Sequence, residues 1–93
     1  MKKFLFFDTT WNQLLRIGNM VAKELKVVAD VETYGLVYET SGKDVNPDKD
    51  VNEFDNCLVT TKLTDIEDYI FRVHPDIVVF AQNTIPDLAT ILY

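Results

Sequence analysis

The chain has 93 residues, of which 47% are hydrophobic and 26% are charged, with a formal net charge of −6. This length and hydrophobic content are enough for one small domain with its own core, and they exclude an intrinsically disordered chain. The net acidity excludes a nucleic-acid partner, because binding would need a Lys/Arg face for the phosphates.

A strand, a helix and a second strand are predicted in the first third of the chain. The apolar run Phe4–Phe7 is typical of a strand that is covered on both faces. Thr10, followed three residues later by Gln13, matches a capping box, so we expect a helix to begin there. Apolar residues then recur at helical spacing, and Lys26–Val31 predicts the second strand.

The region after this strand is predicted to be irregular. Glu32–Gly35 breaks the strand, and Leu36–Tyr38 is expected to resume as a short strand or a hairpin arm. Gly42, Pro47 and many acidic and amide residues then mark an exposed acidic loop at about residues 39–56.

Metal chemistry is not indicated by this loop. Asp44, Asn46 and Asp48 place oxygen atoms at the first, third and fifth positions of an EF-hand calcium loop. Lys49, however, stands at the sixth position, where the sharp turn needs glycine. Asp55 stands at the twelfth, where the loop uses a longer, bidentate Glu. Cys57 and His74 are the single cysteine and histidine, so a zinc site of the usual ligand set is excluded within one chain. We therefore expect no metal, no cofactor, an inert Cys57 and a helix-capping His74.

Two further strands and two helices are predicted in the last third. Cys57–Thr60 is the third strand, and Thr64 with Glu67 forms a second capping box for the helix that follows. Pro75 ends that helix, and Ile77–Phe80 is an unbroken apolar strand.

A final helix is expected to begin near Ile85, because Thr84 and Asp87 form a third capping box and Pro86 is tolerated in the first turn. It ends on apolar residues without a cap. We therefore expect either a further, missing C-terminal domain or a protein partner that docks on this helix. The residues expected at that interface are Leu88, Ile91, Leu92 and Tyr93.

The order of these elements predicts a single α/β domain over residues 1–93, with a small, mainly parallel sheet and helices on both faces. The alternative is an α+β ferredoxin-like fold (βαββαβ), in which residues 26–38 and 54–61 pair as a long antiparallel hairpin. That alternative predicts strands that alternate between apolar and polar residues. Phe4–Phe7 and Ile77–Phe80 do not alternate, so the parallel sheet is preferred.

Ligands of parallel α/β sheets bind outside the carboxyl ends of the strands. These ends should be followed by four loops, at Asp8–Asn12, Glu32–Tyr34, Thr60–Lys62 and Gln82–Thr84. Their hydroxyl and amide groups suit hydrogen bonds to a sugar or an alcohol. The candidate ligand-binding residues are Asp8, Thr9, Asn12, Thr61, Gln82, Asn83 and Thr84. With three glycines and no glycine-rich phosphate motif, a phosphate-cradling loop is excluded, and no catalytic residue is assigned.

The segment HPDIVVF followed by AQNTIPDLATILY resembles the N-terminal Rossmann-like half of two-domain glycosyltransferases and related sugar-nucleotide epimerases. The opening KKFLFFDTTWNQLLRIGNMVAKEL is similar to their first strand and helix. The resemblance implies an acceptor site at Asp8–Asn12 and Gln82–Thr84. It also implies a nucleotide-sugar site in a second domain that this chain lacks, so the chain alone should show no transfer activity.

A second resemblance is to response-regulator receiver domains, in which PDIVVFAQNTIPD is similar to the strand that carries the phosphorylated aspartate. Ala81 stands at that position, and Thr9 stands where a second acidic residue is expected. The resemblance therefore implies a pseudo-receiver that works as an interaction module without phosphorylation.

Two other functions stay open at this point. One is a small acidic protein-binding or inhibitor module, including a phage- or defence-related nucleic-acid mimic. The other is a ferredoxin-like oligomer that binds a small nucleotide. We expect a cytoplasmic protein, because one cysteine excludes an internal disulfide and no apolar run approaches the length of a membrane span.

Overall fold

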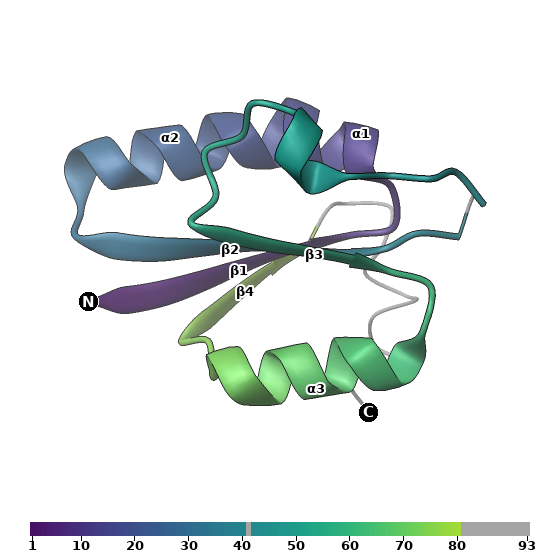
Figure 1. Cartoon of the computed structure of the whole chain (residues 1–93). Coiled ribbons are helices and arrows are strands. Elements are labelled where there is room, and N and C mark those ends of the chain that lie inside the picture. Colours follow the sequence, from purple (N-terminus) through teal and green to yellow (C-terminus); the bar gives the residue numbers. More distant parts are fainter. Residues whose placement is uncertain (41, 81–93) are drawn as a thin grey trace.

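The structure is a computed structural model that describes residues 1–40 and 42–80. Its helices and strands are β1 (Lys2–Asp8), α1 (Trp11–Gln13), η1 (Leu14–Gly18, a π-helical turn), α2 (Asn19–Val28), β2 (Val31–Tyr38), η2 (Pro47–Lys49), β3 (Asn56–Thr60), α3 (Leu63–Val73) and β4 (Ile77–Phe80). The strands form one four-stranded sheet in the order β3-β2-β1-β4 (Figure 1). Helices α1 and α2, with η1 between them, cover one face, and α3 covers the other.

All neighbouring strands run in the same direction, so the predicted α/β class with a parallel sheet is confirmed. β1 lies between β2 and β4, and β2 pairs in parallel with β3, with Leu36 opposite Leu58. The ferredoxin-like alternative is therefore wrong, because it needed residues 26–38 and 54–61 to form an antiparallel hairpin. Helices cover both faces of the sheet, which agrees with the unbroken apolar runs of β1 and β4.

The second strand lies further along the chain than the sequence predicts. The predicted strand Lys26–Val31 is wrong, because α2 continues to Val28 and the Ala29 N–H still donates to the Leu25 carbonyl at 2.9 Å. Val27 and Val28 are each 76% exposed on the helix surface. Their β-branched side chains favour strands, but this preference is weak and the tertiary context overrides it.

β2 also runs straight through the predicted break at Glu32–Gly35. Gly35 is buried where the sheet, the helix and the following loop come together. A Cβ atom at Gly35 would lie 3.1 Å from Cys57 Sγ, 3.1 Å from Leu14 Cδ2 and 3.2 Å from Phe54 Cδ2. A larger residue would therefore push these three side chains apart, so Gly35 serves close packing here and not a turn.

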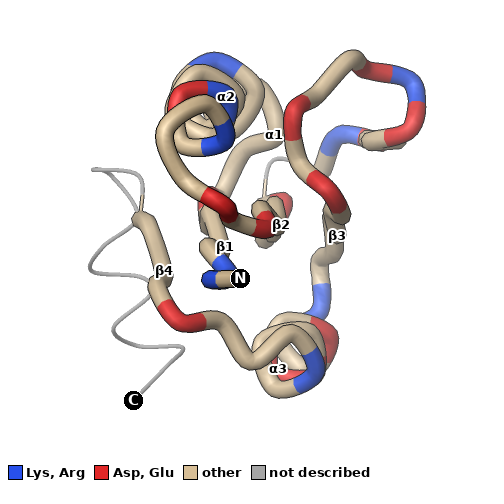
Figure 2. The backbone as a smooth tube through the Cα atoms, turned by 90° about the vertical axis from the view of Figure 1, so that its left-hand side faces the viewer, with Lys and Arg blue, Asp and Glu red and all other residues tan. Residues whose placement is uncertain are grey.

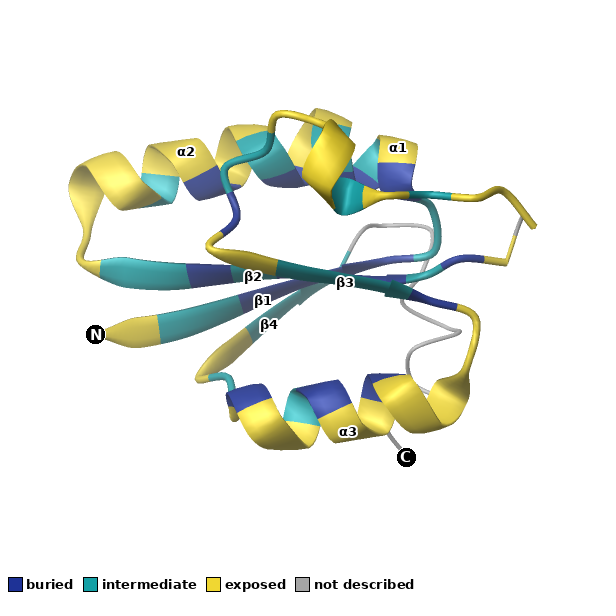
Figure 3. Ribbon diagram, viewed as in Figure 1, coloured by how far each residue is buried: buried dark blue, intermediate teal, exposed yellow. Residues whose placement is uncertain are grey.

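The sheet separates two apolar cores (Figure 3). Successive residues of β1 point to opposite faces, so Leu5 and Phe7 pack against α3, while Phe6 packs on the side of α1 and α2. The buried residues are Leu5, Phe7, Leu36, Ile66, Tyr69 and Val73 on the first side and Phe6, Trp11, Leu14, Ala22, Val37 and Phe54 on the second. Each large side chain that is fully buried contributes about 1.5–3 kcal/mol, so the two cores fix the strand ends in space.

The start of α3 differs from the sequence prediction. The capping box of Thr64 and Glu67 is wrong, because Lys62 occupies the N-cap position. Thr60 Oγ1 accepts a hydrogen bond from the Lys62 N–H at 3.1 Å and donates one to Asp65 Oδ2 at 2.7 Å. The last residue of β3 is thereby joined to the first turn of α3.

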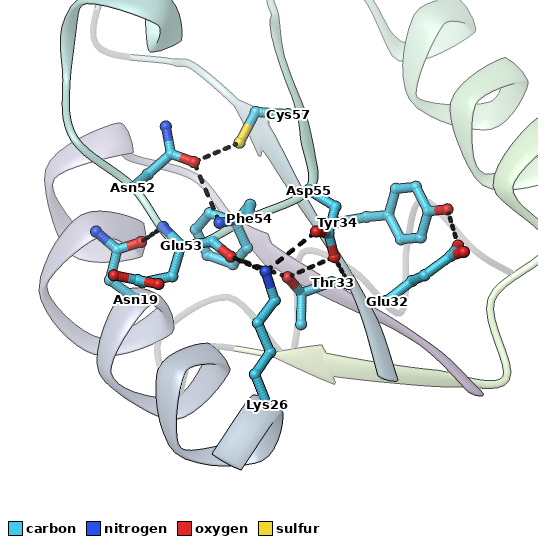
Figure 4. Close-up of polar contacts among 10 residues, drawn as sticks. All are labelled: Asn19, Lys26, Glu32, Thr33, Tyr34, Asn52, Glu53, Phe54, Asp55 and Cys57. Atoms are coloured by element: carbon cyan, nitrogen blue, oxygen red, sulfur yellow. Dashed lines mark hydrogen bonds and ion pairs between the residues drawn. The ribbon is translucent and has the colours of Figure 1, made fainter. Parts of the chain in front are cut away.

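The acidic loop between β2 and β3 is tied down at its second half (Figure 4). Lys26 Nζ donates to the Glu53 carbonyl at 2.6 Å and forms an ion pair with the Asp55 carboxylate at 3.1 Å. Asp55 Oδ2 also accepts from the Thr33 N–H at 2.8 Å, and the Asp55 N–H donates to the Thr33 carbonyl at 2.8 Å. The loop therefore lies against α2 and β2 and forms part of the same layer.

None of the helices in residues 1–40 and 42–80 is long and apolar enough to cross a membrane. The predicted ligand-binding residues Gln82, Asn83 and Thr84 lie outside the described residues. The same holds for the predicted interface residues Leu88, Ile91, Leu92 and Tyr93.

Candidate functional site

The carboxyl ends of the parallel strands meet at one edge of the sheet. From β1 the chain adds β2 and then β3 on one side, and it crosses the sheet through α3 to add β4 on the other side. In open α/β sheets, ligands bind at the carboxyl edge where the strand order reverses in this way. The reversal here is at β1, which ends at Asp8.

Asp8 is buried at this reversal point, with 1% of its surface exposed. Its Oδ1 accepts hydrogen bonds from the Thr9 N–H at 2.6 Å and the Thr10 N–H at 3.4 Å. Burial raises the pKa of the Asp8 carboxyl above its ordinary value, the two amides oppose this rise, and the nearby Glu39 adds to it. Asp8 is therefore a buried acid held against the turn that leads into the helix.

Glu39 is the second buried acid at this edge, with 4% of its surface exposed. It continues the path of β2, since its N–H donates to the Thr60 carbonyl at 2.9 Å. Asp8 pairs with Val37 in the sheet, so Glu39, two residues further on, lies on the same face as Asp8. Its Oε2 accepts from the Trp11 N–H at 3.4 Å.

The sequence prediction missed Glu39 because it ended the second strand too early. It assigned the carboxyl end of that strand to Glu32–Tyr34, but these residues lie in the first half of β2. The assignment of Glu32–Tyr34 to the ligand edge is therefore wrong. The sequence predicts Leu36–Tyr38 as a separate short strand or hairpin arm, whereas the structure makes it the end of β2 and so brings Glu39 to the edge.

The helix that follows Asp8 begins as the sequence predicts. Thr10 is the N-cap residue, and its Oγ1 accepts from the Gln13 N–H at 3.3 Å. The chain then stays helical from Trp11 through η1 to Val28. The start of this helix is thus held by side chains from Asp8, Thr10 and Glu39.

A groove of about 620 Å³ opens above these residues, between the start of α1 and the loop after β2. Trp11 is buried beside it, and its Nε1 donates to Asp50 Oδ2 at 2.7 Å, which joins the two walls. The residues that line the groove are Thr10, Trp11, Asn12, Glu39, Lys43, Asp44, Val45, Asn46, Lys49 and Asp50. This mixture of carboxylate, ammonium, amide and hydroxyl groups suits a polar ligand with several hydroxyls.

The predicted ligand-binding residues do not all reach this groove. Asn12 lines it, Asp8 lies buried at the end of β1, and Thr9 contributes its N–H to Asp8. Thr61 is exposed at the carboxyl end of β3 and is not part of the groove lining. The structure therefore brings Asn12 together with Glu39 and leaves Thr61 apart.

No group of three or more His, Cys, Asp or Glu side chains that could hold a metal ion occurs within residues 1–40 and 42–80. In the EF-hand-like stretch, Asn46 Oδ1 accepts from the Asp48 N–H at 3.0 Å and caps η2.

Burial raises the pKa of the Cys57 thiol to about 11, so it stays protonated at neutral pH and is a poor nucleophile.

No protein-family model, no curated protein and no solved structure significantly matches this chain. A functional assignment therefore depends on the chemistry of the groove and of the two buried acids beneath it.

Proposed function

We propose that this chain is the acceptor-binding α/β domain of a glycosyltransferase-like protein, and that it binds a hydroxyl-rich small molecule in the groove above Asp8 and Glu39. The observation that carries the proposal is the position of this groove. It lies over the carboxyl ends of β1 and β2, next to the point where the strand order reverses. The parallel sheet agrees with the Rossmann-like resemblance of the sequence.

The lining of the groove supports a sugar or another polyol as ligand. A hydroxyl group both donates and accepts hydrogen bonds, so it can pair with carboxylates, amides and ammonium groups. Glu39 and Asp50 offer acceptors, Lys43 and Lys49 offer donors, and Asn12 offers both. The hydrogen bond from Trp11 Nε1 to Asp50 Oδ2 joins the two walls of the groove, which favours a preformed site.

We expect binding without catalysis from the chain alone. The resemblance places the nucleotide-sugar in a second domain, and the groove of this domain would supply contacts to the acceptor only. An assay for transfer with this chain and sugar nucleotides should therefore show no product.

The proposal is tested by titrating the ¹⁵N-labelled chain with a panel of neutral mono- and disaccharides and following the amide signals. Binding sugars should shift the signals of residues 10–12 and 43–50, and Asn12→Ala should weaken that binding. Thr61→Ala is the matched control, because Thr61 is exposed at the same edge but outside the groove. The absence of any saturable shift at these residues, or equal effects of both variants, would contradict the proposal.

A second candidate function is a protein-binding module. Ile17, Met20 and Val21 lie on one face of the helix that follows β1 and are 56%, 61% and 36% exposed. Ile17 and Val21 also line a small apolar crevice with Val79 of β4, and exposed apolar patches of this kind are typical of protein contacts. Comparing the sedimentation of the wild-type chain with that of Met20→Lys would show whether this face binds a second copy of the chain.

The mimic form of this second candidate has less support. A nucleic-acid mimic would gather its acids on one face, as a nucleic acid does with its phosphates. Figure 2 shows Asp and Glu on both sides of the sheet, interspersed with Lys and Arg.

A further inference from the structure

Three consecutive backbone amides at the turn into the helix after β1, those of Thr9, Thr10 and Trp11, donate to acids of the protein itself. In α/β folds, the first amides of such a helix face the carboxyl edge and are a common position for a phosphate group. Here the Thr9 and Thr10 amides donate to Asp8 Oδ1, and the Trp11 amide donates to Glu39 Oε2. The position that a phosphate would take is therefore occupied by two carboxylates.

We propose that Asp8 and Glu39 are specificity-determining residues, which fill this anion position so that the groove accepts uncharged ligands and rejects phosphorylated ones. This inference rests on the proposed function for the existence of a ligand, and it narrows the ligand class to unphosphorylated, hydroxyl-rich molecules. Asp8 comes from β1 and Glu39 follows β2, so the sheet itself holds both carboxylates in place.

Burial and charge both support this role. The two residues are 1% and 4% exposed, so both carboxylates are packed into the fold at this edge. A phosphate in the groove would also face Asp44 and Asp50, which offset the charges of Lys43 and Lys49. Like charges brought together at a binding site cost several kcal/mol, so a phosphate would bind weakly if at all.

The sequence of the turn gives an independent reason. Phosphate-cradling loops need glycine so that the backbone can approach the anion. The turn from Asp8 to Trp11 contains Thr9 and Thr10 and no glycine. This turn is therefore built to hold side-chain carboxylates and not an external phosphate.

The test is a titration of the ¹⁵N-labelled chain with inorganic phosphate at constant ionic strength. In the wild type, the amide signals of Thr9, Thr10 and Trp11 should not respond. In Glu39→Ala the amide signal of Trp11, which loses its acceptor, should shift and saturate, with a dissociation constant for phosphate lowered by about tenfold or more. Asp44→Asn is the matched control, because it removes a carboxylate from the same groove without touching these amides, and its gain in phosphate affinity should be clearly smaller than that of Glu39→Ala.

Three outcomes would overturn the inference. The first is a wild type whose Thr9, Thr10 and Trp11 amides bind phosphate as tightly as those of Glu39→Ala. The second is a folded Glu39→Ala protein that ignores phosphate. The third is an equal gain in Asp44→Asn, which would assign the rejection to overall charge.

Glu39→Gln serves if the alanine variant does not fold, since it keeps an acceptor oxygen for Trp11 and removes the charge. It should gain phosphate affinity by a smaller factor than alanine would, and no gain would again overturn the inference.

The sugar titration tests the proposed function separately. A chain that rejects phosphate and binds no sugar refutes the proposed function alone, and one that binds both refutes the specificity role alone.

Discussion

The backbone N–H of Trp11 donates a 3.4 Å hydrogen bond to Glu39 Oε2, although the two residues are 28 positions apart in the chain. Trp11 begins the helix after β1, and Glu39 continues β2 toward the loop. This one bond therefore ties the start of the helix to the neighbouring strand, at the edge where the groove lies.

Glu39→Ala is expected to lower the free energy of unfolding by about 1–2 kcal/mol, because a buried amide loses a charged acceptor. Glu39→Gln keeps an acceptor oxygen and removes the repulsion from Asp8, so its loss should stay below about 0.5 kcal/mol. Urea denaturation at neutral pH measures both values. Equal losses would show that the charge of Glu39, and not its hydrogen bond, stabilises this edge.

Asp8 is expected to make the protein less stable as the pH rises. Burial raises the pKa of its carboxyl in the folded state above the ordinary value of 3.8. The folded chain therefore holds this proton to a higher pH than the unfolded chain. The stabilising contribution of the proton is complete below pH 3.8 and is lost as the pH rises through the folded-state pKa.

Asp8→Asn should remove that part of the pH dependence while keeping an acceptor for the Thr9 amide. Denaturant unfolding at a series of pH values between the acidic and neutral range measures it. Asp44→Asn, in the exposed loop, provides the control and should follow the wild-type curve. A wild-type slope in Asp8→Asn would contradict the assignment.

Asp55 should have the opposite effect on stability. Burial by itself would raise the pKa of its carboxyl, but the Thr33 amide and Lys26 outweigh burial and lower the pKa below 3.8. Its contribution is present above pH 3.8 and is lost as the pH falls through the folded-state pKa. Because the Asp55 side chain is 46% exposed and solvent screens its charge, we expect Asp55→Asn to cost less than about 1 kcal/mol at neutral pH and nothing in strong acid, by urea denaturation at both conditions. A constant difference at the two pH values would rule out the charge as the cause.

Gly35→Ala is expected to destabilise the fold by about 1–3 kcal/mol, because the added Cβ would overpack the buried contact with Cys57, Leu14 and Phe54. Cys57→Ala removes one of the three crowding atoms. In a double-mutant cycle, the pair Gly35→Ala and Cys57→Ala should therefore be more stable than the sum of the two single changes predicts. Simple additivity, measured by thermal unfolding, would show that Cys57 does not limit the space at Gly35.

The end of α3 offers a stabilising change. His74 has a left-handed backbone with φ 53°, and its N–H donates to the Ile70 carbonyl, which confirms that it caps the helix. This conformation costs a non-glycine residue about 1 kcal/mol, so His74→Gly should raise the free energy of unfolding by about that amount. His74→Ala keeps the strained backbone and should have little effect. A gain in the alanine variant equal to that in the glycine variant would refute backbone strain as the reason.

The sequence by itself determined the fold class and one end of the site. The unbroken apolar runs Phe4–Phe7 and Ile77–Phe80 are typical of strands covered on both faces, and residues of both runs pack into the two cores. The cap at Thr10 and the position of Asp8 at the end of the first strand follow from local patterns, because each depends on residues a few positions away.

Only the tertiary structure decided where β2 lies and what faces Asp8. The valines at the end of α2 carry strand propensity, yet they stay in the helix, because this preference is weak and the tertiary context overrides it. That shift carried the end of β2 to Tyr38 and brought Glu39 to the edge. The contacts of Trp11 with Glu39 and Asp50 span 28 and 39 positions, and no local pattern in the chain records a partner at such a distance.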